Sequence, residues 1–142
     1  MGPYLTGLPA FLSWLGLSLL LMVAFITLYI TVTPPREIKL IREGNVSAAV
    51  CLSGTVLGFV LPLASAMIHG SNLVDFLIWG AIAATVQLLA YGAIRLTFRR
   101  LSDDIVEDRM ATAVMAAGIS LAVGVLNAAA LESRLRLLHP AR

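Results

Sequence analysis

Two amides are the polar side chains best placed to do chemistry in an apolar setting. Gln87 and Asn127 each lie near the middle of a long apolar run. An amide without a hydrogen-bond partner in hydrocarbon costs free energy, so both side chains must face protein or water. Two interpretations stay open: an interhelical hydrogen bond that stabilises packing, or a polar lining along a path for a solute.

Catalytic and metal-binding groups are scarce in the apolar runs. Nucleophilic catalysis needs a base beside a serine or cysteine, and both histidines, His69 and His139, lie outside those runs. Cys51 lies inside one of them, where we interpret it as a small packing residue, and no set of metal ligands converges on it. We therefore expect no enzymatic activity, no metal and no cofactor.

Charged side chains gather in two loops that lead into apolar runs, at residues 36–45 and 101–110. We expect Asn45 to cap the helix that follows, and Arg42 and Glu43 to pair locally or with acids of the second loop. Such exposed pairs contribute only about 0–1 kcal/mol. Charges of both signs suit the docking of a cytoplasmic protein or anionic lipid headgroups, and a purely solvated surface is the alternative. The corner residues of interest are Glu37, Arg42, Glu43, Asn45 and Glu107.

The composition excludes a water-soluble domain. The 142 residues are 59% hydrophobic and 13% charged, with a mean hydropathy of +0.92, whereas soluble domains are about 25% charged. The net charge of +2 would suit an acidic partner, but the basic residues are confined to two loops and a tail. Membrane topology explains that distribution. We expect a lipid bilayer around the protein and no nucleic-acid partner.

Four apolar runs are long enough to cross a bilayer, which takes roughly 20 residues each. Pro34 and Pro35 end the first run, because proline lacks the helical N–H, and residues 36–45 suit a short surface-lying helix. The sequence predicts an all-α polytopic membrane protein in which residues 1–142 form one domain. The predicted spans are residues 8–33, 46–68, 74–98 and 111–131.

Small residues recur at helical spacing in the second and fourth spans. Gly, Ala or Ser four positions apart lets two helix backbones approach closely, since packing drives helix association in lipid. Two such ladders can provide more small-residue packing surface than one small helix bundle needs for its own packing, which favours a homo-oligomer. The predicted packing residues are Gly54 and Gly58 in the second span and Ala116, Ser120, Gly124 and Ala128 in the fourth.

Positive charges predict the orientation of the spans. Seven Lys and Arg residues lie in or beside the two charged loops, and three lie in the C-terminal tail. The positive-inside rule then makes both loops cytoplasmic and both termini periplasmic. Asp75 falls at the outer interface, where Asp75, Asn72 or Ser71 caps the third span, and a functional acid at Asp75 is the alternative.

The chain resembles itself at an offset of 64 residues. The offset aligns Glu43 with Glu107 and divides the chain into halves of about residues 8–70 and 72–132. Because each half holds two spans, the halves share one orientation and form two parallel-repeat hairpins. A pseudo-twofold axis along the membrane normal would bring spans two and four together in the centre, with spans one and three outside.

Four separated motifs carry a family resemblance. They are EIKLIREGNVSAAV at 37–50, GTVLGFVLPLASA at 54–66, Asp75 with WGAIAATVQLL at 79–89, and GVLNAAA at 124–130. On these motifs the chain resembles the YjfL-like inner-membrane family, also called domain of unknown function 350. The resemblance implies four spans, a bacterial inner membrane and a context in envelope-stress or polyamine-linked gene sets. Glu107-Asp108-Arg109 departs from the glycine or second acid that the family tends to carry, which argues against equivalent chemistry at the two corners.

We predict an oligomeric or scaffold-like component of an envelope or membrane-stress system, which docks partners at its cytoplasmic loops. The predicted partners are further copies of the chain and a cytoplasmic protein or anionic lipid. The alternative is a small ion or solute channel or transporter, with Gln87 and Asn127 along a polar path between the second and fourth spans. One geometric observation separates the two hypotheses: whether Gln87 and Asn127 bond each other or face a water-filled cavity.

Overall fold

The computed structural model describes residues 2–3, 5–33 and 37–138, apart from the side chain of Leu135. Within these residues the chain forms six helices and no strand. The prolines that were predicted to end the first span, Pro34 and Pro35, lie outside the described residues. The helices are α1 (Leu8–Val32), α2 (Glu37–Arg42), α3 (Val46–His69), α4 (Leu73–Thr97), α5 (Leu101–Val106) and α6 (Met110–Leu138).

Four of these helices, α1, α3, α4 and α6, are apolar and contain 24 to 29 residues each. At about 1.5 Å per residue each exceeds the roughly 30 Å of a hydrocarbon core. The all-α, four-span class is confirmed, and the bounds of the first three spans are close to those predicted.

Two features of the second half differ from the prediction. The loop predicted at residues 101–110 contains the short helix α5, which buries Leu101 and Ile105 beneath its charges. The helix that contains the fourth span, predicted to end at residue 131, continues to Leu138. Leu and Arg favour helix there, and Arg136 pairs with Glu132 one turn earlier, with 2.6 Å between nitrogen and oxygen.

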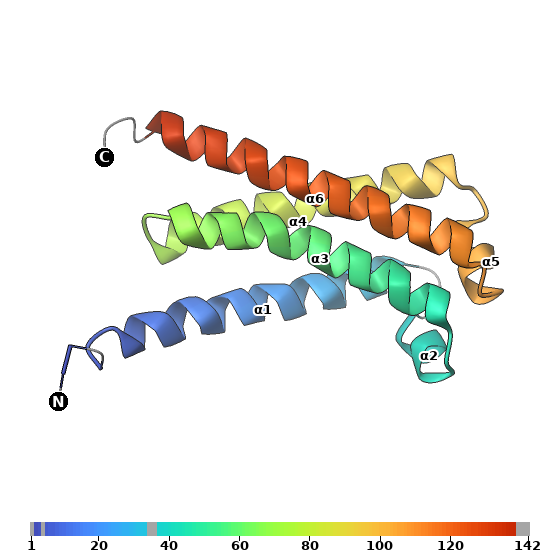
Figure 1. The fold of residues 1–142 in the computed structure, drawn as a ribbon, viewed down its shortest axis with the longest axis horizontal. Helices are drawn as coiled ribbons and strands as arrows, with labels where there is room; N and C mark the ends of the chain where they lie inside the picture. The colour runs from blue at the N-terminus through green and yellow to red at the C-terminus, as the bar shows by residue number, and fades with distance from the viewer. Residues whose placement is uncertain (1, 4, 34–36, 139–142) are drawn as a thin grey trace.

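The long helices run alternately up and down, so both short helices lie at one end of the bundle and both termini at the other (Figure 1). We call these the corner end and the termini end. The helix bounds keep the predicted offset of 64 residues, because α2 and α5 begin at Glu37 and Leu101, and α3 and α6 begin at Val46 and Met110. The internal duplication stays a prediction with which these bounds agree.

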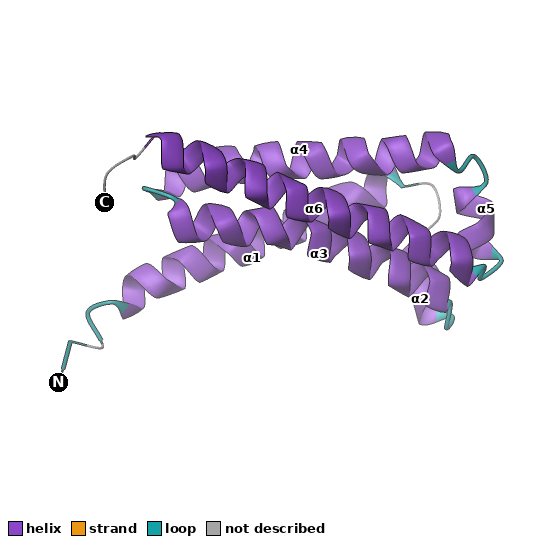
Figure 2. Cartoon of the chain, turned by 45° about the horizontal axis from the view of Figure 1, so that its top comes forward, coloured by secondary structure: helices purple, strands orange, loops and turns teal. Residues whose placement is uncertain are grey.

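Helix α3 is the one that other helices surround. It packs against α1, α4 and α6, whereas α1 packs against α3 and α4 and diverges from the bundle toward its N-terminal end (Figure 2). The stacked rings of Phe25 and Phe59, with centroids 4.2 Å apart, hold α1 on α3. The pseudo-twofold prediction placed both the second and fourth spans at the centre. Those two spans, α3 and α6, form the closest pair of helices, but one face of α6 is not covered by another helix.

The predicted packing residues lie between α3 and α6. A side chain on Gly54 would collide with Ala117, and one on Gly124 would collide with the backbone of Gly58. Ala116 and Ser120 are buried, and the carbonyl of Ala128 accepts a long hydrogen bond of 3.4 Å from Ser65. The two backbones therefore touch along a ladder of small residues, which lie at the packing surface within one chain.

Pro62 explains why the approach is closest at Gly58. Proline has no N–H, so the carbonyl four residues earlier, that of Gly58, loses its helical partner. The backbone of Gly124 lies against that carbonyl. The contact covers an otherwise bare polar group, which would be costly in hydrocarbon.

Replacing Gly124 with Ala should lower the thermal unfolding midpoint, because the added methyl group overlaps the backbone of Gly58. Overpacking of this kind typically costs about 1–3 kcal/mol. Gly92→Ala on α4 is the control, since a side chain there meets no atom of the described residues. Circular dichroism in detergent measures both, and an unchanged midpoint for Gly124→Ala would contradict the close contact.

Candidate functional site

The two corners share one backbone geometry. Each short helix ends with a residue in the left-handed conformation, Gly44 with φ of 87° and Asp108 with φ of 57°. The following amide then bonds back five residues, from Asn45 to Leu40 and from Arg109 to Asp104. This is a Schellman ending, in which glycine is usual and aspartate is tolerated. It turns the chain sharply from each short helix into the next span.

The corners are bonded to each other. The Asn45 side chain accepts a hydrogen bond from the Ala48 amide at 2.8 Å, which confirms the predicted cap, and donates to the Ile105 carbonyl at 2.7 Å. Asp108 of the second corner accepts a 2.8 Å hydrogen bond from the amide of Ser47. This bond lowers the pKa of Asp108, because it favours the ionised carboxylate. The first turn of α3 thus receives an acceptor from each corner.

The ion pairs of the corner end belong to the second corner. Arg109 lies 2.9 Å from Glu107 and 3.7 Å from Asp104, and Thr112 donates to Asp104 at 2.9 Å. Asp104, Glu107 and Arg109 border an open pocket of about 200 Å³. Among the described residues, no ion pair joins Arg42 or Glu43 to these acids, so the pairing predicted across the corners is not formed.

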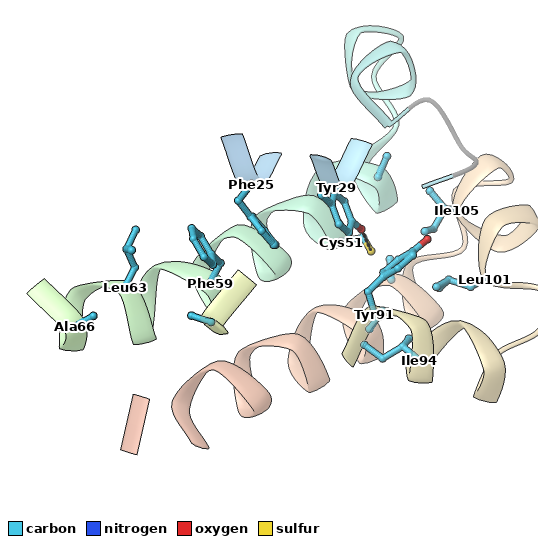
Figure 3. Packing of buried hydrophobic residues seen from close by; sticks show 14 of the residues in the cluster. Phe25, Tyr29, Cys51, Phe59, Leu63, Ala66, Tyr91, Ile94, Leu101 and Ile105 are labelled. Atoms are coloured by element: carbon cyan, nitrogen blue, oxygen red, sulfur yellow. Dashed lines mark hydrogen bonds between the residues drawn. The ribbon is translucent and has the colours of Figure 1, made fainter. Parts of the chain in front are cut away.

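Glu37 is buried rather than part of a charged surface, which corrects the prediction for this residue. Its side chain has no exposed area, and its Oε1 accepts a hydrogen bond of 3.1 Å from the Tyr29 hydroxyl. The same hydroxyl lies 4.0 Å from the sulfur of Cys51, and the rings of Tyr29 and Tyr91 meet edge to face at 5.1 Å. Figure 3 shows the Tyr29 hydroxyl beside the Cys51 sulfur, with the ring of Tyr91 next to them.

We call Tyr29, Glu37, Cys51 and Tyr91 the Glu37 cluster. It joins α1, α2, α3 and α4 at the corner end. Two of its buried oxygens, Oε2 of Glu37 and the hydroxyl oxygen of Tyr91, have no hydrogen-bond partner within the described part of the chain. Burial raises the pKa of Glu37 from 4.5 to about 7, more than the Tyr29 hydrogen bond lowers it. The cluster can therefore take up and release one proton near neutral pH.

The burial of Glu37 was not predicted, because apolar and charged residues alternate around it in the sequence. Ile38, Leu40 and Ile41 alternate with charges, which predicts that the charged residues face water. The signal lay in the 64-residue offset instead, because Glu37 aligns with Leu101, a buried leucine in the second corner. Cys51, interpreted as a packing residue, is indeed buried, but its sulfur also faces the polar cluster. Among the described residues, no group of side chains could hold a metal ion.

The two intramembrane amides do not bond each other. Gln87 is buried and its Nε2 donates to the carbonyl of Ser120 at 3.2 Å and to that of Thr55 at 3.5 Å. It therefore ties α4 to both α3 and α6. Asn127 instead lines a pocket of about 200 Å³ between α4 and α6, and its Nδ2 is buried with no partner in the residues that the structure describes.

The contact between α3 and α6 does not support the predicted polar path between the second and fourth spans. Gly58 and Gly124 touch there, and Gln87 fills the remaining space beside Gly58. At the termini end the cap of α4 is Asn72, whose side chain accepts a hydrogen bond of 2.8 Å from the Asp75 amide. Asp75 is partly exposed in the first turn, so Asn72 takes the role that was open among the three candidates.

The four apolar helices and the polar ends define a small multi-pass integral membrane protein. A family model described as Domain of Unknown Function (DUF350) matches residues 3–131, and the chain belongs to this family. Over 125 residues it is 35% identical to the UPF0719 inner membrane protein YjfL of Escherichia coli (strain K12), an alignment that covers 88% of this chain and 95% of that protein. The protein of the same name in Escherichia coli O157:H7 gives the same values.

These relatives confirm the family resemblance and make the chain an inner-membrane protein. No solved structure matches the chain significantly.

Replacing Glu37 with Gln should remove one component of the pH dependence of stability. Because the folded pKa is raised, the folded state holds a proton that the unfolded state loses between pH 4.5 and about 7. The contribution of Glu37 to the free energy of unfolding is fully present below pH 4.5. It is lost as the pH rises through 7, a decrease of roughly 3 kcal/mol. Glu37→Gln should therefore unfold at a higher temperature than the wild type at pH 8, and the difference should shrink toward pH 5.

Thermal unfolding in detergent from pH 5 to pH 8 measures this effect. The control is Glu43→Gln, an exposed acid of the same corner, which should keep the wild-type profile. A Glu37→Gln variant that also keeps that profile would show that Glu37 is not a buried, titrating group.

Proposed function

We propose that this protein is a non-enzymatic component of an envelope or membrane-stress system, and that its corner end docks a cytoplasmic protein. The observation that carries the proposal is the bonding between the corners. Asn45 and Asp108 join two loops that are far apart in the sequence into one surface. A surface fixed in this way loses little conformational entropy when a partner binds it, which favours docking.

The chemistry of this surface suits a protein partner. Acidic and basic side chains alternate over it, and charge complementarity of that kind selects partners and orients them. Two exposed apolar side chains, Ile38 on α2 and Val106 on α5, add contact area between the charges. Among the described residues, the exposed charged residues of α2, α5 and their flanks are Lys39, Arg42, Glu43, Arg99, Arg100, Asp103, Glu107, Asp108 and Arg109.

The cytoplasmic location of the corner end is part of the proposal. Seven of the ten basic residues lie in or beside the two corners, and the positive-inside rule assigns that end to the cytoplasm. Both termini would then be periplasmic. The proposed absence of enzymatic activity rests on the burial of the Glu37 carboxyl group and the Cys51 thiol, the acid and the nucleophile of the Glu37 cluster.

Self-association is the second element of the proposal. The glycines at Gly54, Gly58 and Gly124 are used inside the chain, so they no longer favour an oligomer. The open face of α6 favours an oligomer instead. A side chain at Gly118 would meet no atom of the described residues, and Val114 and Met115 beside it are exposed. A small residue flanked by larger ones allows a second helix to approach closely in lipid.

Site-specific photo-crosslinking in cells tests both elements. A benzophenone amino acid at Val106 should give an adduct with another protein, and one at Met115 should give an adduct of twice the chain mass. Leu20, exposed on α1, is the control position and should give neither. The Val106 adduct should weaken in the double variant Asn45→Ala, Asp108→Ala, which separates the corners.

An absent Val106 adduct, or the same adduct at Leu20, would contradict docking at the corner end. A chain that stays at single mass with the crosslinker at Met115 would contradict self-association through α6.

A further inference from the structure

A pocket between α4 and α6 lies near the termini end, away from the Glu37 cluster and the corners. It has a volume of about 200 Å³, and Trp79, Asn127 and Arg134 are among the residues that line it. The guanidinium carbon of Arg134 lies 5.9 Å from the centre of the Trp79 ring, at the limit of a cation–π contact.

The pocket contains two groups of hydrogen-bond donors. The Nδ2 of Asn127 is buried and has no partner among the described residues, and the guanidinium group of Arg134 can only donate. The nearest acid in sequence, Glu132, pairs with Arg136 instead. Within the described residues no ion pair engages Arg134. Asp75 lies one turn from Trp79 along α4, but it does not line the pocket. Donors without a matching acceptor indicate a ligand that supplies anionic oxygens.

The depth of the pocket matches the headgroup region of a bilayer. Arg134 follows the first residue of α6, Met110, by 24 positions, or about 36 Å along the helix. This distance exceeds the roughly 30 Å of the hydrocarbon core. Trp79 lies six positions into α4, a depth at which tryptophan is enriched in membrane proteins. Ile82 lines the same pocket and is 42% exposed, so an acyl chain can continue toward the core.

We propose that this pocket binds the phosphate of an anionic phospholipid, with Arg134 and Asn127 donating to the phosphate oxygens and Trp79 packing against the glycerol region. The site faces the leaflet at the termini end. It does not depend on the proposed docking function, because its residues belong to the opposite end of the bundle. A phospholipid fits better than a free phosphate ion, because the pocket combines donors with an exposed apolar rim.

Fluorescence quenching by brominated lipids tests the site directly. The chain has two tryptophans, so the Trp14→Phe variant leaves Trp79 as the only reporter. In mixed micelles, brominated phosphatidylglycerol should quench Trp79 at roughly fivefold lower concentration than brominated phosphatidylcholine, the preference expected for one basic residue near a membrane surface. In the same background Arg134→Gln should abolish the preference, and Asn127→Leu should reduce it.

Arg136→Gln is the matched control on the same helix, since Arg136 already pairs with Glu132 and does not line the pocket. It should keep the fivefold preference. Equal quenching by the two lipids without these substitutions would overturn the proposal, as would an equal loss in Arg136→Gln. The last measurement adds inorganic phosphate, or chloride at the same ionic strength, and asks whether either one displaces the brominated anionic lipid. Displacement of the anionic lipid by phosphate alone would assign the pocket to a free ion and overturn the lipid assignment.

Discussion

The close contact between α3 and α6 is the constraint on which the rest of the structure depends. Lipid offers no hydrophobic difference between helices, so the association must come from packing and from satisfied polar groups. Gly58 and Gly124 supply the packing, because they let the backbones touch beside the carbonyl that Pro62 leaves without its helical partner. Gln87 then donates to the carbonyls of Ser120 and Thr55, which ties α4 to the same pair.

The contact also decides what the two ends of the bundle can do. Because α3 and α6 begin side by side, Asn45 reaches the second corner and Asp108 reaches the first. The corners share a backbone geometry but not a chemistry. Where the second corner buries Leu101, the first buries Glu37 against Tyr29. One corner therefore holds a proton-binding group in its core, and the other holds its charges at the surface.

The sequence was sufficient for the four spans, the small-residue ladders and the Asn45 cap, because each depends on residues close together in the chain. Periodicity says which residues lie on one helix face, and a cap depends on a single side chain. The pattern did not reveal α5, the burial of Glu37 or the partners of Gln87. Each of these depends on which helices become neighbours. Glu37 is the clearest example, since local alternation predicts exposure and only its alignment with Leu101 indicates burial.

The same reasoning explains the two amides. Gln87 and Asn127 each lie near the middle of an apolar run in the sequence. In the structure, however, Gln87 lies where three helices meet and Asn127 lies at a pocket between two helices. No local pattern distinguishes these surroundings. The arrangement depends on how α4 lies across α3 and α6, which is set in turn by the glycine contact.

Nuclear magnetic resonance in lipid nanodiscs tests this glycine contact most directly. A cross-relaxation signal between the Hα protons of Gly58 and Gly124 requires the two backbones to touch, and the structure predicts that signal within a single chain. It should persist when labelled protein is diluted into an excess of unlabelled protein. Loss of the signal on dilution would assign the contact to two different chains, and its absence throughout would contradict the α3–α6 pair as the centre of the fold.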